Sequence, residues 1–220
     1  MNILVIAPHA DDEILGVGGT IARYVSEGNQ IYVCIASRGY EPTFSNELVE
    51  KVLKEASNSH NLLGIKKTYY LNFPASMLEK SERNELNEKL FEVIKEVRPD
   101  IVFIPHFGDM QQDHKVIAKA AMVVLRPKYE HKVPIIYSYE TLSETEWNIP
   151  HAANTFIPNV YVDISNYMNA KLEAMKEYQS QLDTFPNPRS LEVLEALAKY
   201  RGSAIHVKAA EAFALIRQII

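Results

Sequence analysis

Residues 3–19 read ILVIAPHADDEILGVGG, and this stretch decides how the rest of the 220-residue chain is interpreted. The run Ile3–Ala7 is short, continuous and apolar, as expected for a β-strand buried on both faces. A charged loop follows, and Ile14–Glu27 then has the apolar spacing of a helix that stops at Gly28 and Asn29. The stretch predicts a buried strand that runs through a charged loop into a helix.

The same alternation of strand and helix continues over the first 140 residues. Further strands are predicted at 30–36, 67–73, 101–105, 133–138 and 160–164, and further helices at 47–63, 86–97, 114–125 and 165–182. This alternation is typical of right-handed βαβ units, so we expect an α/β fold with a mostly parallel sheet and helices on both faces. The tail, 190–220, is predicted to be mostly helical, and residues 1–220 are expected to form a single domain because no linker or repeat interrupts them.

Composition narrows the class of protein. The net charge is −5 and no long basic run is present, which argues against nucleic acid as the main partner. No apolar run approaches the ~20 residues needed to span a bilayer, and no signal-like region precedes the first strand. The only cysteine, Cys34, cannot form an internal disulfide and is expected in the core. These features predict a cytoplasmic protein without a membrane span.

The loop after the first strand carries His9, the adjacent pair Asp11 and Asp12, and Glu13. Helix capping could account for one or two of these acids. It does not account for His9, nor for two neighbouring carboxylates that need a counter-charge, which a divalent cation would supply. A dinucleotide-binding loop fits less well, because the glycines of residues 16–19 fall inside the helix and an anionic turn repels a pyrophosphate.

A second group of histidines and acids, between His106 and His114, follows the strand at 101–105. In a doubly wound sheet the first and fourth strands are often neighbours at the switch point, so the two loops are expected to meet. A catalytic zinc site uses three nitrogen or oxygen ligands and leaves one position open. His9, Asp12 and His114 supply such a set. Of the other histidines, His60 is expected in the core or at its boundary.

Several motifs resemble one enzyme family. Residues 7–13 (APHADDE) resemble the A-H-P-D-D-E signature of the PIG-L/LmbE-like N-deacetylases, and residues 111–114 (QQDH) resemble that family's second motif, H-x-D-H. In the tail, residues 185–192, 200–202 and 210–213 are similar to bacterial members. The resemblance spans nearly the whole chain.

Membership of this family implies a Rossmann-like fold, one zinc ion per chain, and hydrolysis of an N-acetyl group on an N-acetylglucosamine derivative or another amino-sugar conjugate. The resemblance places the zinc on His9, Asp12 and His114, makes Asp11 the general base, and gives Asp113 the part of orienting the site. Two positions depart from the pattern. Ala10 replaces a proline, and Gln111 stands where many members have a histidine that helps to stabilise the transition state.

The mechanism expected from these assignments is attack on the amide by zinc-bound water. Asp11 would accept the proton from the water, a role that contributes roughly 10²–10⁴-fold. Asp11 is also favoured as the donor of a proton to the leaving amine, with His106 and His206 as alternatives. The residues expected to contact substrate are Arg38, His106, Asp109, Arg189 and His206. The charged tail from Phe185 onward, including Glu211, is expected to fold over the carboxyl edge of the sheet and to help form the substrate pocket.

Two other functions remain open at this point. One is a different metal-dependent hydrolase of the phosphoesterase type, which would generally need two metals and more ligands. The other is a non-catalytic protein that binds a sugar or nucleotide on the same fold. The expected partner is a small N-acetylated molecule, and the sequence leaves homo-oligomer formation open.

Overall fold

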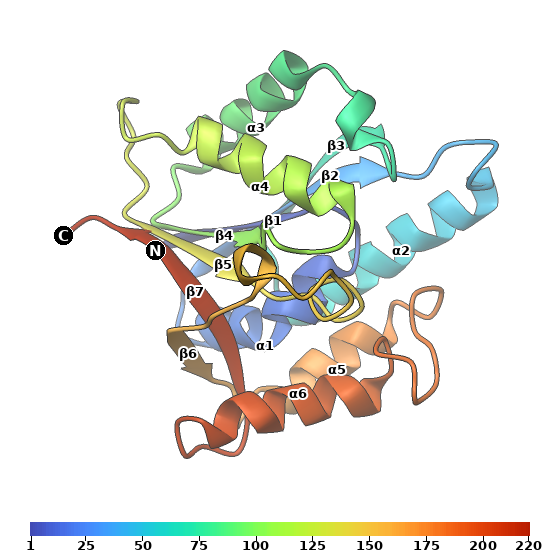
Figure 1. The fold of residues 1–220 in the computed structure, drawn as a ribbon, viewed down its shortest axis with the longest axis vertical. Helices are drawn as coiled ribbons and strands as arrows, with labels where there is room; N and C mark the ends of the chain where they lie inside the picture. Colours follow the sequence, from blue (N-terminus) through green and yellow to red (C-terminus); the bar gives the residue numbers. More distant parts are fainter.

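The computed structural model describes all residues, 1–220, and contains one seven-stranded sheet of order β3-β2-β1-β4-β5-β7-β6 (Figure 1). The strands are β1 (Asn2–Ala7), β2 (Gln30–Arg38), β3 (Lys67–Pro74), β4 (Ile101–Pro105), β5 (Ile135–Tyr139), β6 (Val160–Asp163) and β7 (Ala210–Gln218). The helices are α1 (Asp12–Ser26), α2 (Asn46–Leu63), α3 (Arg83–Val97), α4 (Gln112–Val124), α5 (Met168–Lys176) and α6 (Leu191–Ser203), with short 3₁₀ turns η1 (Leu78–Lys80) and η2 (Ala152–Asn154). β1 to β5 are parallel, and β7 is antiparallel to both β5 and β6.

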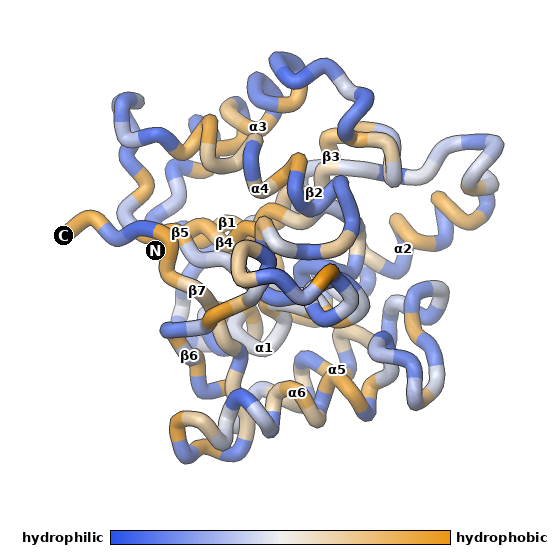
Figure 2. Tube along the Cα trace, viewed as in Figure 1, coloured by the Kyte–Doolittle hydropathy of each residue, from blue (hydrophilic) through white to orange (hydrophobic).

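The sheet separates two apolar cores, as a two-residue side-chain period requires. In β1, Ile3 and Val5 face the core formed with α1, α2, α5 and α6, whereas Leu4 and Ile6 face the core formed with α3 and α4. Figure 2 shows the apolar residues concentrated along the central strands and on the inner sides of the helices. The predicted mostly parallel sheet with helices on both faces is confirmed.

The position of β1 in the sheet brings the two sequence motifs together. β1 pairs with β2 on one side and with β4 on the other, both in parallel. The strand order therefore reverses at this point, and Ala7 and Pro105 end at the same edge of the sheet. Loops at such a switch point form the usual ligand site of open α/β sheets.

The tail corrects one prediction. Its first part forms helix α6, as expected, but residues 210–218 form strand β7 between β5 and β6 rather than a helix. The sequence AEAFALIRQ contains three alanines together with glutamate, leucine, arginine and glutamine, all of which favour helices locally. Hydrogen bonding to two neighbouring strands and burial of Phe213 outweigh that weak preference.

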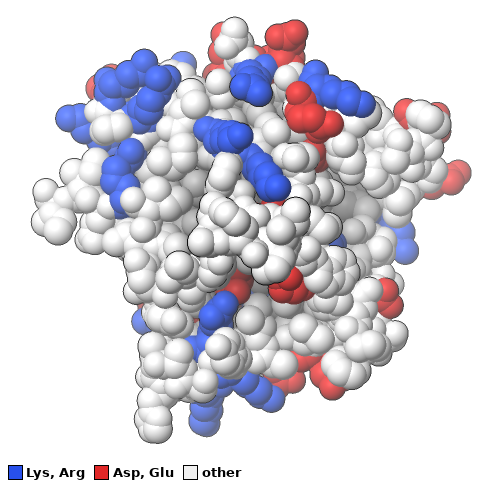
Figure 3. Space-filling view, in the orientation of Figure 1, with Lys and Arg blue, Asp and Glu red and all other residues white.

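Helix length and surface charge can both be compared with the sequence predictions. No helix of the protein is both long and apolar enough to cross a membrane. Basic and acidic side chains are interspersed over the face shown in Figure 3, rather than gathered into one basic surface.

Candidate active site

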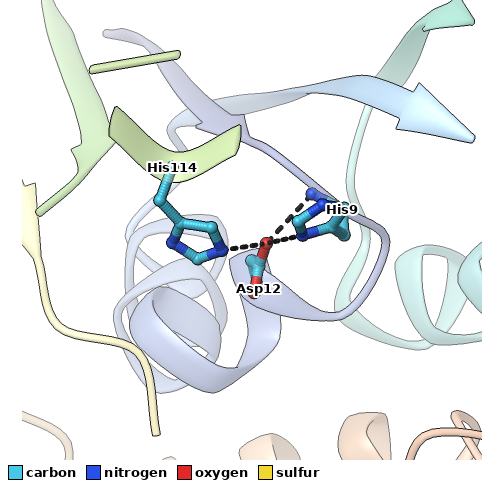
Figure 4. Close-up of side chains that lie close together, drawn as sticks. All are labelled: His9, Asp12 and His114. Atoms are coloured by element: carbon cyan, nitrogen blue, oxygen red, sulfur yellow. Dashed lines mark hydrogen bonds and ion pairs between the residues drawn. The ribbon is translucent and has the colours of Figure 1, made fainter. Parts of the chain in front are cut away.

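His9, Asp12 and His114 converge at the carboxyl edge of the sheet (Figure 4). His9 lies in the loop after β1, Asp12 begins α1, and His114 lies in the first turn of α4. One ligand atom from each residue lies within 4.8 Å of the others. Asp12 and His114 are fully buried, and the His9 side chain is 21% exposed, so the group is open to solvent on one side only.

Each histidine ring is held by a second carboxylate. Nε2 of His9 lies 3.0 Å from Oδ2 of Asp113, and Nδ1 of His114 lies 2.8 Å from Oδ2 of Asp109. If these nitrogens carry the protons, Nδ1 of His9 and Nε2 of His114 keep their lone pairs for a metal. Such carboxylate–histidine pairs are the usual support of metal-ligating imidazoles.

The donor set fits a divalent metal. Oδ1 of Asp12 is buried and has no hydrogen-bond partner in the protein, an arrangement that costs stability unless something else satisfies it. Nε2 of His114 is also buried, and its contact is with Oδ2 of Asp12, at 3.3 Å. Two imidazole nitrogens and a carboxylate are a ligand set typical of zinc. The three residues therefore form a possible metal site.

A metal ion at this site would have to displace protons from the two histidine rings, because their pKa values are raised. Burial lowers the pKa of His9, but hydrogen bonds with Asp113 and Asp12 outweigh it and raise the pKa to about 9. Burial likewise lowers the pKa of His114, yet the charge of Asp12 and the bond with Asp109 raise it to about 10. Metal ions and protons therefore compete for these rings.

Asp11 occupies a strained backbone position beside this group. Its φ angle is 118°, which non-glycine residues rarely adopt and which is often found at functional sites. Although Asp11 is the N-cap residue of α1, its side chain makes no capping hydrogen bond. Capping therefore does not explain this acid.

The carboxylate of Asp11 instead forms an ion pair with Arg189 of the tail. Burial raises the pKa of Asp11, the charge of Arg189 lowers it, and nearby Asp12 and Glu13 raise it further, to about 7. A group with such a pKa can gain and lose a proton near neutral pH, as general acid–base catalysis requires.

A buried hydrogen-bond network centred on Glu13 holds the backbone of Asp11 in place. Oε2 of Glu13 accepts a hydrogen bond from the backbone N–H of Asp11 at 3.1 Å. Oε1 of the same carboxylate lies 2.5 Å from the Tyr178 hydroxyl and 3.0 Å from Nε2 of His60. The prediction that His60 belongs to the core is confirmed, and its contact with Glu13 connects it to the site.

A chamber of about 270 Å³ opens over His9 and Asp11. Gln111 lines this chamber, and so do Arg38 and Arg189, two of the predicted substrate contacts. Oε1 of Gln111 and Nε of Arg38 are buried there without a partner in the protein. Sequence reasoning missed Glu144 and Gln181, which also line the chamber.

Three of the predicted substrate contacts do not line the chamber. Asp109 is fully buried, where it accepts hydrogen bonds from His114 and from Oγ1 of Thr145, so it is a support for His114. His106 lies against the backbone oxygen of Asn154, and His206 lies in the exposed turn between α6 and β7.

Glu211 also lies outside the chamber, contrary to the prediction for the tail. It forms a buried ion pair with Lys171 and accepts hydrogen bonds from the backbone N–H groups of Gly19 and Thr20, at 2.9 and 2.7 Å. Nζ of Lys171 donates to the backbone oxygen of Leu15 at 2.7 Å. The pair thus hydrogen-bonds to the backbone in the middle of α1, and its role is structural.

Replacing Lys171 by methionine should destabilise the protein by about 3–5 kcal/mol, because Glu211 would remain buried without a counter-charge. For a chain of this size we expect the Tm to fall by roughly 6–20 °C. Lys176→Met on the same helix is the control, since Lys176 is half-exposed and pairs only with Glu173. Equal Tm values for the two variants, measured by calorimetry, would show that Glu211 does not depend on Lys171.

Comparison with known proteins identifies the family to which the chain belongs. Residues 4–125 match the family model PIG-L, described as GlcNAc-PI de-N-acetylase. The chain is 30% identical over 185 residues to the uncharacterized deacetylase YaiS of Escherichia coli strain K12, covering 81% of this chain and 91% of the relative. It therefore belongs to the PIG-L family, and its class is that of an amide hydrolase.

Other relatives cover most of the chain. A probable N-acetyl-alpha-D-glucosaminyl L-malate deacetylase of Bacillus anthracis is 28% identical over 195 residues, covering 83% of this chain and 82% of that protein. The solved structure of N,N'-diacetylchitobiose deacetylase from Pyrococcus horikoshii aligns with a TM-score of 0.78 and 26% identity, over 97% of this chain and 83% of that one. These likenesses extend beyond the matched family model into the tail.

Proposed function

We propose that residues 1–220 act as one domain that removes the acetyl group from an N-acetylated amino sugar or its conjugate, with one zinc ion held by His9, Asp12 and His114. The observation that carries the proposal is the convergence of these residues beside Asp11, at the polar end of a chamber that His9 and Asp11 line. The names of the relatives, which describe deacetylases of N-acetylglucosamine-containing molecules, support the choice of substrate.

When bound, zinc would act as a Lewis acid that acidifies water and polarises the amide carbonyl. The protein would supply the proton transfers. Asp11 lies next to the ligand Asp12 and lines the chamber, so its carboxylate is placed to accept a proton from water. The Asp11 carboxylate would then return the proton to the amine, which departs only when protonated.

Arg189 holds Asp11 in position for this role. Its Nη1 pairs with Oδ2 of Asp11, and its Nε donates to Oγ of Ser143 at 2.8 Å. The guanidinium is thus fixed at both ends, and its positive charge offsets the repulsion between Asp11 and its acidic neighbours. Arg189 in this position is a support for the base as well as a wall of the chamber.

Gln111 would donate a hydrogen bond to the oxygen of the amide as negative charge develops on it. Its side chain lines the chamber, and its backbone N–H is anchored to Oε2 of Glu144 at 3.1 Å. A neutral amide can donate a hydrogen bond but supplies no positive charge. Gln111 would therefore supply the hydrogen bond of the histidine found in other family members, but not its positive charge.

On this basis Gln111→Ala should lower kcat by about 10–10³-fold, as loss of one oxyanion donor does, with zinc content unchanged. The neighbouring Gln112→Ala is the control, because Gln112 is exposed and does not line the chamber. Steady-state kinetics on the best substrate provides the measurement. Equal kcat for the two variants would remove Gln111 from the mechanism.

The test of the proposed function is a substrate panel with the zinc-loaded protein. N-acetylated monosaccharides, their glycosides and nucleotide sugars are assayed for acetate and free amine, with phosphate esters as the comparison. We expect about one zinc per chain and acetate release from at least one sugar. Phosphate release without acetate release would favour a phosphoesterase, and zinc-independent sugar binding without turnover would favour a binding protein.

A further inference from the structure

One wall of the active-site chamber is apolar. It is built by the end of β2, the loop after it, and the first two turns of α2. The large apolar side chains of this wall are Ile35, Phe44, Leu48, Val49, Val52 and Leu53, of which Ile35 and Val49 are already buried by protein. We refer to them as the α2 wall.

The α2 wall differs from the hydrophobic core because some of its side chains are only partly covered by protein. Further along α2, Ala56 and Leu63 are buried in the core that this helix shares with the sheet. The first turns extend past that core, where Leu48 is 37% exposed and Phe44 and Leu53 are half-buried. The apolar stripe of the helix thus continues into the chamber, where Leu48 and Leu53 are only partly covered by protein.

The loop before α2 is shaped to present its aromatic ring to the chamber. A Cβ on Gly39 would lie 2.6 Å from Cβ of Phe44, so only glycine lets the chain fold back this closely. The backbone N–H of Phe44 donates to the oxygen of Tyr40 at 3.0 Å and closes the turn. Apolar walls with a few convergent polar groups are the usual form of small-molecule sites.

The rest of the chamber is polar. His9, Asp11, Gln111, Glu144 and Arg189 stand on the side of the possible metal site. These groups can bind the acetamide and the hydroxyls of a sugar, but a sugar alone would leave the α2 wall uncovered. In the proposed function the acyl group is acetyl, whose single methyl group is too small to cover the exposed parts of Phe44, Leu48, Val52 and Leu53.

We propose that the substrate carries an apolar alkyl or aryl aglycone on its N-acetylated amino sugar, and that the α2 wall binds this aglycone. The inference rests on the proposed function, because the sugar and its acetamide must lie at the polar end. It adds a binding subsite, lined chiefly by Phe44, Leu48 and Val52, and a substrate class: amphiphilic glycosides of N-acetylated amino sugars.

The test compares methyl, butyl and hexyl β-glycosides of N-acetylglucosamine at monomeric concentrations, with zinc-loaded protein. Each buried methylene should improve binding by about fourfold. We therefore expect kcat/KM to rise at least tenfold from methyl to hexyl, chiefly through KM. Equal kcat/KM along the series would overturn the proposal.

Substitution of the wall identifies the subsite. Leu48→Ser and Val52→Ser should each lower the hexyl-to-methyl ratio of kcat/KM at least threefold, a ratio that does not depend on the fraction of folded protein. Leu62→Ser is the matched control, since Leu62 is 48% exposed on the same helix and does not line the chamber. An unchanged ratio in both wall variants, or a rise along a series of longer N-acyl groups instead, would overturn the assignment.

A binding measurement separates this inference from the proposed function. Hexyl β-glucoside has no amide to hydrolyse, and it should bind at least tenfold more tightly than methyl β-glucoside by calorimetry, with the difference reduced in Leu48→Ser. This result without acetate release from any glycoside would support the subsite and contradict the deacetylase proposal. Acetate release with equal binding of the two glucosides would do the reverse.

Discussion

The His114→Ala variant is expected to bind no stoichiometric zinc and to release no acetate above background. His114 would be one of only three protein ligands, and it is the one supplied by α4, so its loss removes the link between the two loops. A catalytic zinc ion is held by three protein ligands, so loss of one leaves only two protein bonds to the metal. Elemental analysis of the purified, zinc-equilibrated protein measures the first effect, and acetate release measures the second.

His131→Ala is the control for loss of a histidine as such. His131 lies at the opposite edge of the sheet, where its Nε2 is 2.9 Å from the backbone oxygen of Pro99. A milder variant at the site, Asp109→Asn, should weaken zinc binding by about 10–100-fold, since it disturbs the partner of His114 without removing a ligand. A folded His114→Ala protein that still held a full equivalent of zinc would show that the ligand set is wrong.

The sequence was sufficient to predict the meeting of the two motifs. Continuous apolar runs at β1 and β4 are typical of buried parallel strands, and the first and fourth strands of a doubly wound sheet are often neighbours, as they are in this protein. His9, Asp12 and His114 follow from this topology because each lies within a few residues of a strand end or a helix start. Their positions depend little on details of the loops.

Residues whose roles depend on the loops were predicted less well. Asp109 comes five residues before His114, and the spacing does not show whether its side chain turns inward or toward substrate. The loop turns it inward, so it supports His114. Glu144 and Gln181 lie in irregular segments far from either motif, and no pattern in the sequence distinguishes them from surface residues.

The error at β7 has a different cause. Nothing in this nine-residue segment, which consists mostly of helix-forming residues, indicates that it pairs with β5 and β6 in the folded protein. Glu211 was assigned to the substrate pocket for the same reason, because its charge was unexplained in a segment expected to be helical. In the strand it points into α1 and meets Lys171, a residue 40 positions earlier.

Asp11 is the residue on which the proposed chemistry depends most. Its carboxylate is 1% exposed, is paired with Arg189, and stands on a backbone that Glu13 holds at a positive φ. Asparagine has the same shape and tolerates positive φ better than most residues, so Asp11→Asn should fold normally. It cannot accept a proton as a carboxylate does.

Asp11→Asn should therefore retain about one zinc per chain while kcat falls by about 10²–10⁴-fold, the usual contribution of a general base. KM should change little, because the substitution removes an interaction made in the transition state rather than one made with the bound sugar. Glu192→Gln, an exposed acid in the first turn of α6, is the control and should have normal kinetics. Loss of zinc in Asp11→Asn would make Asp11 a metal ligand, and normal turnover with full zinc would move the base to another residue of the chamber.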